Sequence, residues 1–318
     1  MFQGKQITIF GGSGFIGRNI VRELAQQGAV IEVACRDVEA AKFLKVQGVV
    51  GQVTPVHVDI TEGESAIAPA VDGADMVINL CGILFESGRN RFDAVQGTAP
   101  GLIASAAAKA GASRFLHVSA IGADANSDSR YARSKAAGEE AVRSTFSTAT
   151  ILRPSVVFGP DDDFFNRFGA MAESFPFLPL IGGGKTKFQP VYVDDVADAA
   201  LNALASDEAA GKTYELGGPK VYTFKELMEL VIAQTGRPRR LIDLPFWAAS
   251  VKAAFLEWLP TPPLTRDQVT LLKSDNVVSE GALTLADLGV TPTACEAILP
   301  TYLDRFRPGG RYNRFRAA

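Results

Sequence analysis

The chain has 318 residues, 47% of them hydrophobic and 21% charged, and a formal net charge of −3 at pH 7. This length and composition suit one large globular domain with a smaller lobe, and the near-neutral charge gives no general electrostatic basis for binding nucleic acid. Three widely spaced cysteines and two histidines argue against a disulfide framework, a metal centre and a histidine-based hydrolase triad.

The first half of the chain alternates short apolar runs with amphipathic or alanine-rich stretches. The apolar runs that we expect to form strands are 6–10, 30–35, 56–58, 76–80, 114–119 and 148–152. The stretches that we expect to form helices begin near residue 16 and continue at 38–47, 62–71, 92–112 and 129–145. Strands separated by helices imply right-handed parallel crossovers. The sequence therefore predicts an α/β fold of the Rossmann type, a doubly wound and mostly parallel sheet with a smaller C-terminal lobe.

The composition changes after Pro160, where prolines and glycines cluster. We expect residues 1–160 to form the sheet domain and 161–318 the smaller, α-rich lobe, with 189–216 returning to the sheet domain. The elements expected in this part are strands at 189–192 and 213–216 and helices at 194–205, 224–235, 245–258 and 265–273. The acidic run 161–163 more often opens a helix than holds a cation, and we expect no metal site.

The glycine-rich stretch Gly11-Gly12-Ser13-Gly14-Phe15-Ile16-Gly17 follows the first expected strand and opens the first helix. Gly11 permits a tight turn, Gly14 lets the backbone approach a pyrophosphate, and Gly17 lets the helix pack closely on the strand. The unpaired N–H groups at the start of that helix would hold the pyrophosphate. The stretch therefore predicts a dinucleotide site, and the alternative is a purely structural glycine-rich turn.

The residues around the second expected strand bear on which dinucleotide binds. NAD-specific proteins carry a carboxylate at the end of this strand, whereas this chain has Cys35 followed by Arg36, with Arg18 directly after the last glycine. Two guanidiniums suit a 2′-phosphate, which a carboxylate would repel. We therefore expect NADPH in preference to NAD, unless Arg36 is simply a solvated surface charge. Asp59 and Ile60 are placed to contact adenine, although Asp59 can equally cap a helix.

A second motif lies on the helix expected at 129–145. Tyr131 and Lys135 are four residues apart and share a helix face, so the ammonium group can favour the phenolate and bring a general acid/base nearer to neutral pH. The preceding strand ends at Ser119, whose hydroxyl would be a hydrogen-bond donor to a substrate. Tyr-x-x-x-Lys is common by chance, but it is more specific here because it follows a strand in a chain that opens with the glycine motif.

Several stretches together resemble one protein family. They are GGSGFIG at 11–17, Asp59-Ile60, Asn79-Leu80-Cys81-Gly82, Tyr131 with Lys135, RPSVVFGP at 153–160 and QPVYVDDV at 189–196. Over about two thirds of the chain this set resembles an extended or atypical short-chain dehydrogenase/reductase. More narrowly, 152–168 and 189–193 resemble the NADPH-binding accessory subunit of respiratory complex I, with looser support from 264–269 and 285–290.

The resemblance implies the residues of the site. The cofactor would be held by Gly11, Gly14, Phe15, Ile16, Gly17, Arg18, Arg36, Asp59, Ile60, Leu80, Cys81, Gly82, Tyr131, Lys135 and Pro154. Ser119, Tyr131 and Lys135 would be catalytic. However, the interval from Ser119 to Tyr131 is short for a catalytic member, and in one register Ala120 fills the serine position, which would weaken oxyanion stabilisation.

The resemblance also implies a role. The complex I subunit holds NADPH without a turnover role, and we expect this chain to be such an accessory subunit that stabilises or assembles the complex. The alternative is an NADP-dependent reductase or epimerase acting on a small carbonyl, sugar or quinone-like substrate. No signal or transit segment precedes the first strand, so we expect a bacterial cytoplasmic chain or a processed one. Its place would be peripheral, on the cytoplasmic side of the inner membrane or the matrix side.

The C-terminal third is where contacts with partners are expected. The apolar run 245–259 is too short to span a bilayer, and it is either lobe core or a surface for a partner or the membrane interface. Five arginines interleaved with aromatic residues between 305 and 316 form a basic tail that either frays or docks on an acidic partner or lipid headgroups. We expect the partners to be other complex I subunits and the lipid surface, and not nucleic acid.

Overall fold

The computed structural model describes residues 1–310, and the last residues of the predicted basic tail, from Arg311 on, lie outside this range. The chain divides into two compact units. Unit 1 contains residues 1–154, 194–216 and 281–291, and unit 2 contains 155–193, 217–280 and the chain from Pro292 on. Each unit is therefore assembled from segments that are separated in the sequence.

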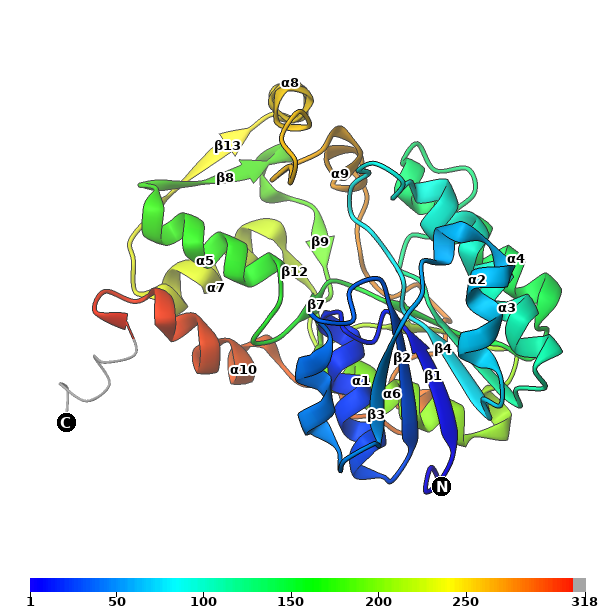
Figure 1. The fold of residues 1–318 in the computed structure, drawn as a ribbon. Helices are drawn as coiled ribbons and strands as arrows, with labels where there is room; N and C mark the ends of the chain where they lie inside the picture. The colour runs from blue at the N-terminus through cyan, green and yellow to red at the C-terminus, as the bar shows by residue number, and fades with distance from the viewer. Residues whose placement is uncertain (311–318) are drawn as a thin grey trace, which may run out of the picture. The chain divides into compact units, whose positions relative to one another are not determined.

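Unit 1 is built on a seven-stranded sheet (Figure 1). Its strands are β1 (Gln6–Phe10), β2 (Val30–Cys35), β3 (Val53–His57), β4 (Met76–Asn79), β5 (Arg114–Val118), β6 (Thr150–Pro154) and β11 (Thr213–Leu216). They lie in the order β11-β6-β5-β4-β1-β2-β3, and every neighbouring pair is parallel. The Rossmann-type α/β fold expected from the sequence is confirmed.

Helices cover both faces of this sheet. The α-helices are α1 (Phe15–Gln26), α2 (Glu64–Val71), α3 (Ala99–Lys109), α4 (Arg130–Thr145) and α6 (Val193–Ala205). Short 3-10 turns lie at η1 (Lys42–Gln47), η2 (Ile60–Glu62), η5 (Asp207–Ala209) and η6 (Ala286–Leu288). Figure 1 shows α2, α3 and α4 on one face and α1 and α6 on the other. The buried side chains of α2, α3 and α4 pack with those of the sheet in one apolar core, as amphipathic helices require.

The helix expected at 92–112 differs from the structure at its start, which is a π-helix, η3 (Asp93–Thr98), leading into α3. Pro100 has no N–H and cannot donate to the carbonyl four residues earlier, so a regular α-helix is interrupted here. That carbonyl belongs to Gln96, and a Cβ on Gly138 would lie only 2.0 Å from it. Gly138 therefore lets α4 pack directly against the π-helical turn.

Unit 2 combines helices with two-stranded pairs. Its helices are α5 (Phe164–Ser174), α7 (Phe224–Thr235), α8 (Phe246–Leu256), α9 (Arg266–Leu271) and α10 (Cys295–Tyr302), with η4 (Gly182–Gly184) and η7 (Leu303–Phe306). Its strand pairs are β7 (Val157–Phe158) with β10 (Val191–Tyr192), β8 (Phe177–Ile181) with β13 (Arg240–Leu244), and β9 (Lys187–Phe188) with β12 (Tyr222–Thr223). Of the segment 189–216, β11 lies in the central sheet, whereas β10 pairs outside it.

The core of unit 2 is rich in aromatic side chains. The acidic run 161–163 lies where α5 begins, as expected for a helix N-terminus. Buried Asp162 accepts hydrogen bonds from the N–H groups of Gly159 and Asn166 and from the hydroxyl of Tyr302 on α10. This carboxylate therefore joins the start of α5 to the end of α10. Within residues 1–310, no helix combines the length and the apolar character needed to cross a bilayer.

Candidate functional site

The turn from β1 to α1 is where the sequence predicts a pyrophosphate cradle. Gly11 has a φ of +78°, which favours glycine, and a Cβ on Gly17 would lie 2.4 Å from the Gly11 carbonyl oxygen. Gly14 precedes α1 without a side-chain cap, and a Cβ there would meet no atom within 4 Å except that same carbonyl oxygen, at 3.3 Å. The N–H groups of the first turn thus lack a capping side chain. Phe15 and Ile16 begin the helix and are half-buried.

Of the two arginines predicted to select the cofactor, Arg18 lies at this turn and Arg36 directly follows β2, the strand next to β1. The Nε atom of Arg18 donates to the Gly14 carbonyl at 3.3 Å, and its guanidinium lies 5.3 Å from the ring centre of Phe43. Arg36 is exposed directly after β2, and its Nη1 donates to the Oδ1 of Asn90 at 2.6 Å. Asp37, the next carboxylate, accepts from the N–H of Ala40 at 2.9 Å and so caps its own loop. Cys35 itself ends β2 and is buried, so the last residue of this strand is not a carboxylate.

Asp59 and Ile60 follow β3 closely. Asp59 accepts from the N–H and the hydroxyl of Thr61 at 3.0 and 2.7 Å, so it caps η2. Burial raises the pKa of this carboxyl, but the Thr61 hydrogen bonds and the charges of Arg36 and Arg89 hold it below its ordinary value. Ile60 is buried. The helix-cap interpretation of Asp59 is therefore correct, and contact with adenine stays a prediction.

The other end of the site lies where β4 and β5 meet α4. Lys135 is buried, its Nζ donates to the carbonyl of Val118 at 3.3 Å, and it lies 5.9 Å from the ring centre of Tyr131. A Cβ on Gly82 would lie 3.3 Å from the same Nζ. Burial lowers the pKa of Lys135 to about 8, opposed by Cys81 and then Glu139. The predicted Tyr-Lys pair and the stretch after β4 are thus brought together.

Ser119 lies at the end of β5 and is buried. Its N–H donates to the carbonyl of Leu152 at 2.7 Å, and its Oγ has no hydrogen-bond partner among residues 1–310. Ala120, the other candidate for the serine position, has no hydroxyl. Pro154 ends β6, is buried and accepts from the N–H of Ile121 at 3.0 Å. A buried hydroxyl without a partner is a group that a substrate or water can satisfy.

Sequence reasoning named Asn79 only as part of a family motif and gave no role to His117 or Asn90. His117 and Asn79 lie on neighbouring strands, and their side chains are 3.2 Å apart at His117 Nδ1 and Asn79 Nδ2. Asn90 contacts Arg36 from a loop 54 residues later. The pairing of β4 with β5 brings His117 to Asn79, and a loop brings Asn90 to Arg36, so no local motif signals either contact. Within residues 1–310 no group of three or more His, Cys, Asp or Glu residues could hold a metal ion.

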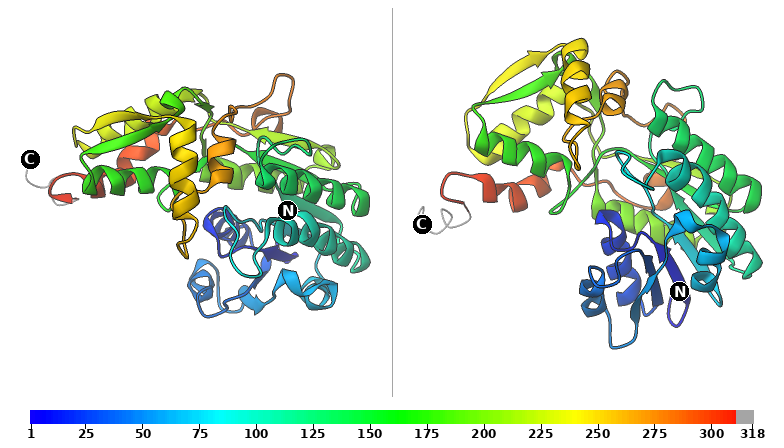
Figure 2. Two further views of the ribbon diagram at one scale, coloured as in Figure 1. Left: turned by 90° about the horizontal axis from the view of Figure 1, so that it is seen from above. Right: turned by 45° about the horizontal axis from the view of Figure 1, so that its top comes forward.

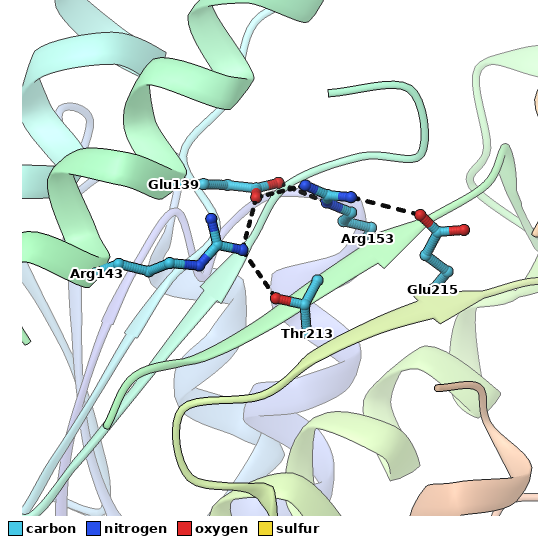
Figure 3. Close-up of polar contacts among 5 residues, drawn as sticks. All are labelled: Glu139, Arg143, Arg153, Thr213 and Glu215. Atoms are coloured by element: carbon cyan, nitrogen blue, oxygen red, sulfur yellow. Dashed lines mark hydrogen bonds and ion pairs between the residues drawn. The ribbon is translucent and has the colours of Figure 1, made fainter. Parts of the chain in front are cut away.

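The face of α4 that carries Tyr131 and Lys135 continues into an ionic network, drawn in Figure 3. Buried Glu139 accepts from Arg153 of β6 at 2.8 Å on each oxygen and from Arg143 at 3.1 Å. The two arginines extend the network to β11, through Arg143 to Thr213 at 2.9 Å and through Arg153 to Glu215 at 3.5 Å. This network fixes the position of α4 relative to the strands β6 and β11.

The chain is similar in sequence to several known proteins. Residues 7–217 match the NAD dependent epimerase/dehydratase family. The mitochondrial NADH dehydrogenase (ubiquinone) 1 alpha subcomplex subunit 9 of Arabidopsis thaliana is 39% identical over 315 residues, covering 95% of this chain and 78% of the relative. A ceramide reductase of Caulobacter vibrioides is 32% identical over 245 residues, covering 75% and 73%.

A solved structure shares the fold. The dTDP-glucose 4,6-dehydratase of Streptomyces venezuelae, crystallised with NAD and TYD, superposes with a TM-score of 0.71 at 20% identity, covering 98% of each chain. At this identity the likeness concerns the fold alone.

Proposed function

Because the chain belongs to the NAD dependent epimerase/dehydratase family, we propose that it holds a nicotinamide dinucleotide and acts as an accessory subunit of NADH:ubiquinone oxidoreductase. The observation that carries this proposal is the 39% identity to a complex I subunit over 95% of the chain, which leaves little of either unit unmatched. The nucleotide cradle supports it, since the uncapped start of α1 and the open space at Gly14 suit a pyrophosphate.

The surface of α8 supports a subunit role. Trp247, Val251 and Phe255 recur every four residues on α8, and Trp258 follows in the turn after its end. The four side chains are 53% to 89% exposed. We call these four residues the α8 stripe. The opposite side of α8, at Ala249 and Ala253, is buried against α9, and Figure 2 shows the two helices side by side. Four exposed apolar side chains, three of them aromatic, suit contact with a partner subunit or with the headgroup region of a membrane.

The test is purification of the tagged chain from source membranes in mild detergent, followed by mass spectrometry. We expect complex I subunits to be recovered with the wild type and to be strongly reduced with Trp247→Ser/Phe255→Ser. Val46→Ser/Val50→Ser is the matched control, because these valines are exposed in unit 1 outside the stripe. Binding of the wild type, but not the stripe variant, to phospholipid vesicles would identify lipid as the partner of the stripe. A wild-type chain recovered without complex I subunits contradicts the proposal.

We further propose that the cofactor is NADPH in preference to NADH. Arg18 at the cradle and Arg36 directly after β2 supply two guanidiniums, and a 2′-phosphate forms charge-assisted hydrogen bonds with such groups. We expect Arg36→Ala to weaken NADPH binding about tenfold or more, the effect of losing one such bond, while NADH binding stays unchanged. Calorimetry on both cofactors tests this, with Arg114→Ala, at the amino end of β5, as the control. Equal affinity for both cofactors, unaffected by Arg36→Ala, would rule the preference out.

A second candidate function is an NADP-dependent reductase or epimerase for a small carbonyl, sugar or quinone-like substrate. The observation that favours it is the buried Oγ of Ser119, which has no hydrogen-bond partner within residues 1–310, in a site that also holds Tyr131 and Lys135. In this reading Tyr131 is the acid/base, Lys135 its electrostatic partner, and Ser119 the donor to the developing oxyanion. The similarity to a ceramide reductase is compatible with it.

A further inference from the structure

The loop between β4 and η3 contacts two parts of the candidate site in unit 1, the end of β2 and the start of α4. We call residues 83–91 the strap. Its tip is a tight turn in which Ser87 and Asn90 exchange two backbone hydrogen bonds of 3.0 and 2.9 Å. Beyond the turn, the side chain of Asn90 contacts Arg36 at the end of β2, and Arg89 lies 3.4 Å from Glu62 of η2.

The strap is anchored independently of Arg36. The carboxylate of Glu86 accepts from both terminal nitrogens of Arg130, at 2.8 and 3.1 Å, and from the N–H of Phe92 at 2.9 Å. Arg130 is the first residue of α4, and Phe92 packs edge-on against Tyr131 at 5.9 Å. Because these contacts hold the strap at α4, Asn90 is placed before any ligand arrives and does not simply follow a mobile arginine.

The contact between Asn90 and Arg36 determines how much charge and how many donors Arg36 can still offer to an anion. A guanidinium has five N–H donors in a fixed plane, and the amide oxygen of Asn90 takes one of them at 2.6 Å. A neutral amide fixes the orientation of the group but leaves its charge and its remaining donors for another acceptor. An aspartate at this position would make a stronger bond and cancel the charge.

We propose that Asn90 is a positioning residue for cofactor selection, which holds the guanidinium of Arg36 in the orientation that receives the 2′-phosphate. The inference rests on the NADPH preference proposed above and extends it from Arg36 to the strap. The end of β2 is itself braced, since His57 Nδ1 lies 2.9 Å from the carbonyl oxygen of Arg36. Both the backbone and the side chain of Arg36 are therefore held from neighbouring segments.

The test is calorimetry of the full-length chain with 2′,5′-ADP and with 5′-AMP, which differ by the phosphate in question. We expect Asn90→Asp to weaken binding of 2′,5′-ADP about tenfold, because it neutralises Arg36, and to leave 5′-AMP within about twofold. Asn90→Ala, which frees the guanidinium without cancelling its charge, should cost about threefold for 2′,5′-ADP alone. Asn126→Asp, an exposed asparagine of the same unit, is the control for the added charge.

A merely structural role for Asn90 predicts the opposite order. If the amide only ties down the strap, Asn90→Asp keeps the tie and Asn90→Ala loses it, so alanine is the more harmful change and both nucleotides are affected alike. That result, or wild-type selectivity in Asn90→Asp, overturns the inference. If Arg36→Ala removes the NADPH preference and Asn90→Asp does not, the inference fails while the cofactor proposal stands. If the wild type itself does not discriminate, both fail together.

Discussion

His117 is a buried ionisable residue two positions before Ser119 on β5. It is 1% exposed, its Nδ1 lies 3.2 Å from Asn79 Nδ2, and its Nε2 has no hydrogen-bond partner among the described residues. Burial, and then the positive charge of Lys135, lower the pKa of His117 to about 3. Folding therefore keeps this imidazole neutral in mildly acidic solution, where an unfolded chain would protonate it.

This shift predicts a pH dependence of stability. Between pH 6.5 and 3 the unfolded chain binds a proton at His117 that the folded chain does not, so the free energy of unfolding falls as the pH is lowered through this window. At pH 4.5, two pH units below the ordinary pKa, the loss from this residue is about 2 to 3 kcal/mol. We expect His117→Gln to reduce the drop in stability between pH 7 and pH 4.5 by this amount in urea unfolding.

The chain's other histidine supplies the control for that experiment. His57 is exposed, and His57→Gln makes the same chemical change at a surface position. Equal pH dependence in wild type and His117→Gln would show that His117 is not the titrating group. The same experiment isolates this residue from the carboxyl groups, because those are common to all three proteins.

At the scale of the elements, α4 is organised by its four-residue spacing. Tyr131, Lys135, Glu139 and Arg143 recur every four residues along the helix, and the last two belong to the network in Figure 3. Because Glu139 is 1% exposed and receives two guanidiniums, it is the group that the network depends on. The network thus sets the position of the helix that presents the predicted acid/base.

We expect Glu139→Ala to lower the free energy of unfolding by about 3 to 5 kcal/mol, because it leaves Arg153 and Arg143 partly buried without their common partner. Glu140→Ala, at the exposed neighbouring position on the same helix, should change it by less than about 0.5 kcal/mol. Urea unfolding measures both. Similar values for the two variants would mean that the network contributes little to the position of α4.

Local sequence signals determined how much of this could be predicted. The strands of the central sheet are short runs of buried apolar residues, and the glycine motif and Tyr-x-x-x-Lys are contiguous, so each was recognisable in place. The π-helical turn before α3 was not predicted, because it depends on Pro100 and on the approach of Gly138 from another helix. The pairing of β10 with β7 was not predicted either, because strands of two residues are too short to show a periodic pattern. Asn90 meets Arg36 only through the folded loop.

At the scale of the whole molecule, the question is whether the nucleotide is a reactant or a structural ligand. A ligand that binds only the folded state stabilises it by about 2.7 kcal/mol at one hundred times its dissociation constant, without any electron transfer. An accessory subunit needs this binding but no acid/base, whereas a reductase needs Tyr131. The two proposed functions therefore predict different results when the Tyr131 hydroxyl is removed. An accessory subunit keeps its role, whereas a reductase loses turnover.

We expect Tyr131→Phe to leave NADPH binding within about twofold, since the ring and its packing remain, and to leave complex I assembly and NADH:ubiquinone activity unchanged. Gly14→Val is the contrasting variant: its side chain occupies the space kept open for the pyrophosphate, so it should abolish NADPH binding and reduce recovery of the assembled complex. The measurements are calorimetry, native electrophoresis of membranes, and NADPH oxidation by the purified chain with a panel of carbonyl and quinone compounds. Oxidation by the wild type that disappears in Tyr131→Phe would make the chain a reductase, because only then does the phenol hydroxyl take part in turnover.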